Sequence, residues 1–142
     1  MRFWDSSAVV PLCLAEPHTS VVRPLIDADP RVIVWWGSRT ECVSAVMRAQ
    51  RNGAPGSTLA DDARVTLERL ASTWSEVQPS EPLRVRAERL LVAHPLRAAD
   101  ACQLAAALVW SRGETARRTF VSFDQRLREA ARREGFTVLP HS

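Results

Sequence analysis

Short apolar runs alternate with longer amphipathic segments along most of the chain. The runs are rich in β-branched and aromatic residues, and apolar residues recur at helical spacing in the segments between them. We predict strands over residues 3–4, 31–36, 77–78, 119–122 and 136–139. We predict helices over residues 8–16, 17–28, 38–51, 58–76, 82–93, 96–110 and 124–134. Strands that alternate with helices are typical of an α/β protein with a mainly parallel sheet.

Local sequence features add detail to two of the predicted helices. Pro11 is expected to bend the helix at 8–16, because proline removes one backbone donor. The segment Ser38-Arg39-Thr40-Glu41 has the form of a capping box, with Ser38 as the N-cap and Glu41 three positions later. The helix at 38–51 is therefore expected to begin directly after the second strand.

Composition indicates an ordinary globular protein. The chain has 142 residues, of which 46% are hydrophobic and 25% charged, and this suits a single domain over residues 1–142. No apolar run approaches the roughly 18 residues of a membrane span, and the N-terminal segment does not resemble a secretory signal. The three cysteines are scattered and lie in apolar helical contexts, which predicts buried free thiols. We therefore expect a cytoplasmic protein with no membrane partner.

The arginine, histidine and tryptophan residues give weaker indications of function. All 19 basic residues are Arg, and residues 81–142 carry 11 Arg against 7 acidic residues, which would suit a polyanionic partner. We expect all three histidines at the surface, including His94 beside Pro95. Four of the five tryptophans fall on apolar faces and are expected in the core or a dimer interface rather than against nucleic-acid bases: Trp35, Trp36, Trp74 and Trp110.

Four acidic residues share a position near the start of a predicted helix: Asp5, Glu41, Asp100 and Asp124. One interpretation is helix capping, which favours acids at these positions. The other is convergence, because the carboxyl ends of parallel strands share one edge of a sheet, where ligands bind. Asp100 suits capping less well, since it is expected one turn inside its helix beside an apolar face. A metal ion, or an Arg such as Arg97, would offset its charge.

Four converging carboxylates would require a cation, because their mutual repulsion raises their pKa values. Oxygen ligands without His or Cys favour Mg²⁺ or Mn²⁺. Ser6 and Ser122 stand beside two of these acids and could add supporting hydroxyls. The convergence hypothesis thus predicts a hard-metal site formed by the four acids.

The chain resembles the PIN-domain ribonucleases, and among them the VapC-type toxins of bacterial toxin–antitoxin pairs. The resemblance extends over nearly the whole length and rests on FWDSSAVVPLCLAE, Glu41, LRAADACQLAAAL and FVSFDQRLREAARREGF. It implies a three-layer PIN-like domain with a mainly parallel central sheet flanked by helices. The family's acidic tetrad falls on Asp5, Glu41, Asp100 and Asp124, and its small hydroxyl positions fall on Ser6 and Ser122. One departure is Gln103, where relatives often carry His.

The resemblance also implies an activity and partners. The expected activity is Mg²⁺- or Mn²⁺-dependent endoribonuclease cleavage by metal-activated water, which leaves 5′-phosphate and 3′-hydroxyl products. A homodimer and a cognate VapB-type antitoxin, whose C-terminal segment fills the groove, are the implied partners. Arg97, Arg117 and Arg118 are candidates to bind the RNA backbone.

Rival functions remain open on the residues alone. A non-catalytic RNA-binding or antitoxin-sequestered PIN-like module would keep the acids as helix caps and use the basic half for binding. A phospho-acceptor receiver domain is disfavoured because its chemistry needs a Lys near the acid, and the chain has none. A haloacid-type phosphohydrolase would carry a second Asp two residues after the first, where this chain has Ser7.

Overall fold

Five parallel strands form the central sheet of the computed structural model, which describes residues 1–141. They are β1 (Arg2–Trp4), β2 (Val32–Trp35), β3 (Ser75–Val77), β4 (Thr119–Val121) and β5 (Thr137–Leu139). Their order in space is β3-β2-β1-β4-β5, so the first strand of the chain lies at the centre. Phe3 is in register with Ile33 on one side and Phe120 on the other. The order reverses direction at β1, and such a switch point leaves a crevice at the carboxyl edge of the sheet.

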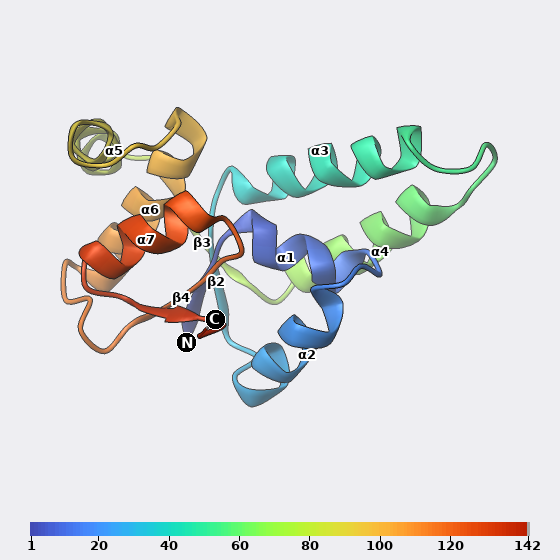
Figure 1. The fold of residues 1–142 in the computed structure, drawn as a ribbon, viewed down its shortest axis with the longest axis horizontal. Coiled ribbons are helices and arrows are strands. Elements are labelled where there is room, and N and C mark those ends of the chain that lie inside the picture. The colour runs from blue at the N-terminus through green and yellow to red at the C-terminus, as the bar shows by residue number, and fades with distance from the viewer. Residues whose placement is uncertain (142) are drawn as a thin grey trace.

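Seven helices cover the two faces of this sheet, as Figure 1 shows. One face is covered by α1 (Ser6–Cys13), α2 (Thr19–Ala28), α3 (Ser38–Arg51) and α4 (Leu59–Ala71). The other is covered by α5 (Glu81–Ala93), α6 (Ala98–Ser111) and α7 (Gln125–Arg133). Helices α3 and α4 form a hairpin that extends to one side of the molecule (Figure 1). The predicted three-layer α/β architecture is confirmed.

The alternation of side chains along each strand divides the interior into two cores. On β1, Phe3 points to the α5–α7 side and Trp4 to the α1–α4 side, and both are fully buried. On the α5–α7 side, the rings of Phe3 and Phe120 stack with centroids 5.3 Å apart, and Phe136 lies 5.8 Å from Phe120. These aromatic contacts join β1 and β4, the two strands that flank the crevice.

Several element boundaries differ from the prediction. Helix α1 begins at Ser6, directly after β1, and ends at Cys13, with Pro11 buried inside it. Helix α4 ends at Ala71 instead of residue 76, because Ser75–Val77 pairs with β2 as strand β3. Strand pairing on the sheet edge thus overrides the helical periodicity that continues through this segment in the sequence.

Two expectations about single residues are wrong, and a third is narrowed to one of its two alternatives. The N-cap of α3 is Gly37 and not Ser38, which is buried inside the first turn, so no capping box forms. His94 is buried and not at the surface, with its Nε2 2.7 Å from Oε2 of Glu134. Trp36 is 53% exposed and so lies outside the core of the single chain, because β2 ends at Trp35. The alternative expectation for Trp36, a dimer interface, stays a prediction.

None of the helices in residues 1–141 combines the length and the apolar character that a bilayer span requires.

We expect Phe120→Ala to lower the free energy of unfolding by about 3–5 kcal/mol, because it leaves a cavity between the rings of Phe3 and Phe136 in the buried core. Urea denaturation followed by circular dichroism measures this loss. Val92→Ala is the control, since Val92 is 90% exposed and its truncation should change stability by less than about 0.5 kcal/mol. Equal losses in both variants would contradict the assigned core.

Candidate active site

Four elements bring acidic residues to the carboxyl edge of the sheet. Asp5 follows β1 and is the N-cap of α1, and Asp124 comes shortly after β4 and is the N-cap of α7. Glu41 lies in the first turn of α3, and Asp100 lies in the first turn of α6. The loops that follow parallel strands share one edge, so the fold places all four residues around the same crevice.

Asp5 is the most deeply buried of the four and is only 3% exposed. Its Oδ2 accepts hydrogen bonds from the hydroxyls of Ser7, at 2.5 Å, and Ser122, at 2.9 Å. The hydroxyl of Ser6 lies farther away, 3.4 Å from Oδ1. Burial raises the pKa of Asp5, the two short hydroxyl bonds oppose that rise, and the charge of Asp124 adds to it. Ser7 is therefore a supporting hydroxyl that the sequence analysis missed, although it stands only two residues from Asp5.

The same hydroxyls join the two halves of the crevice. Ser7 Oγ accepts a hydrogen bond from the backbone N–H of Phe123, at 2.9 Å. Ser122 Oγ accepts one from the backbone N–H of Asp124, at 3.1 Å. Each hydroxyl thus donates to Asp5 and accepts from the segment between β4 and α7. This network fixes the Asp5 carboxylate relative to Asp124.

Glu41 is held by a residue that had no assigned role in the sequence. Gln103, on α6, is 1% exposed, and its Nε2 donates to Oε1 of Glu41 at 2.6 Å and to Oγ of Ser38 at 2.8 Å. Burial raises the pKa of Glu41 to about 7, with the charges of Asp5 and Asp100 adding to the rise and the Gln103 bond opposing it. The sequence offers only weak evidence for this role of Gln103, namely its position one helical turn after Asp100 on the same face of the helix.

Asp100 and Asp124 face each other across α6 and α7. Burial raises the pKa of Asp100, the charge of Asp124 raises it further, and Arg97 and Arg126 act in the opposite direction. Asp124 also caps α7, since its Oδ1 accepts a hydrogen bond from the backbone N–H of Leu127 at 2.9 Å. Capping and a position in the acidic crevice are therefore compatible at Asp124.

The four carboxylates repel one another in a closed sequence: Asp5 with Glu41, Glu41 with Asp100, Asp100 with Asp124, and Asp124 with Asp5. None takes part in a salt bridge within residues 1–141. In the same residues, no three His, Cys, Asp or Glu side chains lie close enough together to form a ready-made metal site. The edge thus carries four carboxylates without a salt bridge, and this donor set fits a hard divalent cation.

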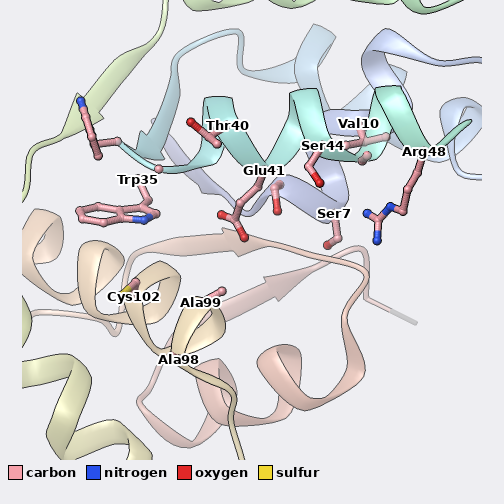
Figure 2. Close-up of a pocket in the computed structure, with 14 residues that line it drawn as sticks. Ser7, Val10, Trp35, Thr40, Glu41, Ser44, Arg48, Ala98, Ala99 and Cys102 are labelled. Carbon is pink, nitrogen blue, oxygen red and sulfur yellow. The ribbon is translucent and has the colours of Figure 1, made fainter. Parts of the chain in front are cut away.

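A cavity of about 820 Å³ opens beside Glu41, the one acid of the four that lines it. Figure 2 shows Glu41 and Arg48 pointing from α3 into the space between α3 and α6, with Ser7 facing the same space from α1. Trp35 and Trp36 line it where β2 ends, and Ala98, Ala99 and Cys102 line it from α6. The cavity therefore combines a carboxylate, an arginine and aromatic side chains.

The arginines named from the sequence do not all lie at this edge. Arg97 is the N-cap of α6 and stands close to Asp100. Arg117 and Arg118 come directly before β4, which puts them at the opposite edge of the sheet, where Arg118 lies 5.0 Å from the ring centroid of Trp110. Arg48 and Arg126 lie at the acidic edge instead. Arg48 lies two helical turns after Glu41, and this spacing could have predicted from the sequence that both side chains share one face of α3.

Comparison with known proteins identifies the family. Residues 2–133 match the PIN domain, so the chain belongs to the PIN domain family. PIN domains are generally metal-dependent nucleases. The crystal structure of PAE2754 from Pyrobaculum aerophilum has a similar fold, with a TM-score of 0.67 and 19% identity, covering 97% of this chain and 88% of that one. No curated protein gives a significant match.

The raised pKa of Glu41 predicts how the stability of the metal-free protein depends on pH. The folded protein keeps the Glu41 proton up to about pH 7, whereas the unfolded chain loses it near 4.5, so the contribution of Glu41 to stability falls as the pH rises between these values. We expect Glu41→Gln to be more stable than the wild type at pH 8, by on the order of 1 kcal/mol after solvent screening, and about equal at pH 4. Urea titrations with EDTA present measure the difference. A Glu41→Gln gain that is the same at both pH values would contradict the assigned burial.

Proposed function

We propose that this chain is a Mg²⁺- or Mn²⁺-dependent endoribonuclease and acts as the toxin of a toxin–antitoxin pair. The observation that carries the proposal is the set of four mutually repelling carboxylates, delivered by four separate elements to the carboxyl edge of a PIN-domain fold. Helix capping alone does not account for this set, because neither Asp5 nor Glu41 caps its helix with a side-chain hydrogen bond.

In this proposal Asp5, Glu41, Asp100 and Asp124 would hold the cation. A bound Mg²⁺ or Mn²⁺ lowers the pKa of water and offsets charge on a scissile phosphate. Ser7 and Ser122 keep the Asp5 carboxylate in one orientation, and Gln103 does the same for Glu41. Ser6 is the third, more distant hydroxyl. These bonds are preorganised, so the ligands need little rearrangement when the cation binds.

The RNA backbone would be bound by the arginines around the acidic edge. Arg97 and Arg126 flank Asp100, and Arg48 projects into the cavity beside Glu41. Guanidinium groups there would bind phosphates next to the scissile one and make the affinity depend on salt. Arg117 and Arg118, at the opposite edge, are not needed for this contact.

The toxin assignment rests on the sequence resemblance to VapC-type proteins. It includes a cognate VapB-type antitoxin that occupies the groove, a homodimer, a cytoplasmic location and a single domain over residues 1–142. The cavity beside Glu41 supports the antitoxin part, because a basic side chain placed there would pair with the acids.

One observation favours a second candidate function. Asp124 does cap α7, and no three of the potential ligands in residues 1–141 are drawn together. A non-catalytic PIN-like module that binds RNA, or is held by an antitoxin, would have these properties. Isothermal titration with Mn²⁺ separates the two candidates, since only the nuclease requires the acids to bind the cation.

We expect Asp5→Asn and Asp100→Asn to lower the rate of RNA cleavage by more than roughly 100-fold, because a lost ligand should cost more than a lost outer-shell contact. Asn at position 5 can still accept the Ser7 and Ser122 hydroxyl bonds, so the fold should persist. Cleavage of labelled RNA and growth after induced expression are the measurements. Asp61→Asn, at an exposed site in the first turn of α4, is the control. Full cleavage and toxicity in both site variants would refute the proposal.

Removal of divalent cations should stop cleavage, because the carboxylates would then lack the ion that offsets the phosphate charge. We expect EDTA to abolish cleavage and added Mn²⁺ to restore it. Mn²⁺ should also raise the melting temperature of the wild type and have a much smaller effect on Asp5→Asn. Cleavage that persists in EDTA, or equal melting shifts in both proteins, would contradict a metal site at these acids.

A further inference from the structure

Trp36 is an indole that the fold leaves in solvent. It is 53% exposed, whereas Trp4 is fully buried and the remaining three tryptophans are partly buried. Exposing so large an apolar ring forgoes the stabilisation that its burial would bring. The position is not a loop tip, because Trp36 lies between the end of β2 and the start of α3.

The backbone and the neighbouring ring hold Trp36 in place. Its N–H donates to the carbonyl of Val77, at 3.0 Å, which continues the pairing of β2 with β3. The ring of Trp35 meets it edge-on, with centroids 6.3 Å apart and an interplanar angle of 71°. Trp35 is confined in turn, since a Cβ at Gly37 would come within 2.5 Å of its Nε1. The exposed ring is therefore in contact with a second ring, which lies against the backbone at Gly37.

The surroundings of Trp36 decide which ligand would cover it. Trp36 lines the same cavity of about 820 Å³ as Glu41 and Arg48. An indole could stack on any flat partner. In this cavity, however, it shares the space with the Glu41 carboxylate and the Arg48 guanidinium. A nucleotide has matching parts, namely a planar base and a phosphate that an arginine can bind.

We propose that Trp36 is the stacking platform for an unpaired base of the RNA substrate, with Arg48 binding a phosphate of the same strand. The proposal rests on the proposed nuclease function and adds to it two residues that contact the substrate, one at a base and one at a phosphate. A base within a duplex stacks on its neighbours and cannot offer its face to an indole. Stacking is tolerant of sequence, so Trp36 selects unpaired RNA and not a particular base.

The test measures binding without cleavage, in EDTA, by fluorescence anisotropy. Labelled oligo(A) and oligo(U) are compared with an abasic ribose-phosphate oligomer of the same length, which has the same charge and no bases. We expect the wild type to prefer the oligonucleotides with bases. Trp36→Ala should bind them roughly tenfold more weakly and bind the abasic oligomer as the wild type does. Trp36→Phe should retain part of the preference, because it keeps an aromatic face.

Val92→Ala removes an exposed apolar side chain on α5 outside the cavity and is expected to match the wild type. The proposal is overturned if Trp36→Ala keeps the full preference for bases. It is also overturned if Trp36→Ala changes only the molecular mass in light scattering, since the ring would then belong to a protein contact. A wild type that cleaves RNA with Mn²⁺ while Trp36→Ala binds normally refutes only the stacking platform. A wild type that never cleaves but loses base preference in Trp36→Ala refutes only the nuclease.

Discussion

A carboxylate that is 3% exposed has lost most of its hydration, and Asp5 replaces that hydration with hydrogen bonds from Ser7 and Ser122. Those two hydroxyls come from the segments that follow β1 and β4, so keeping Asp5 buried requires the two strands to stay in register. Each hydroxyl also accepts a backbone N–H from Phe123 or Asp124. The position of Asp124, and through it the mutual repulsion with Asp100, follows from this network.

The strand order explains why Asp5 lies at the crevice on the carboxyl edge of the sheet. Because β1 lies at the centre and the chain builds the sheet outward on both sides of it, the loops after β1 and β4 open onto one crevice. The helices α3 and α6 then approach this crevice from opposite faces of the sheet and bring Glu41 and Asp100. Gln103 bridges the two layers by its hydrogen bonds to Ser38 and Glu41, so a contact between α3 and α6 also sets the orientation of a potential ligand.

The candidate site includes basic and aromatic side chains besides its four acids. Helix α3 supplies both Glu41 and Arg48 to one cavity, and Trp36 stands just before that helix. Negative charge, positive charge and an exposed ring therefore follow from the placement of a single segment of 13 residues, from Trp36 after β2 to Arg48 in the last turn of α3. In the proposed nuclease, metal, phosphate and base would each meet a different part of this segment, and the half-exposed indole would gain a partner when RNA binds.

Periodicity and residue type were sufficient to predict the α/β class, the parallel sheet and the four acids near helix starts, because apolar spacing and strand ends are local properties of the chain. Local signals failed at Ser38 and His94, whose burial depends on which distant element packs against them. The sequence could not distinguish Ser6 from Ser7 as the partner of Asp5, or Arg117 and Arg118 from Arg48 and Arg126 as neighbours of the acids. These choices depend on which edge of the sheet and which side of a helix each residue occupies, and only the packing of the three layers decides that.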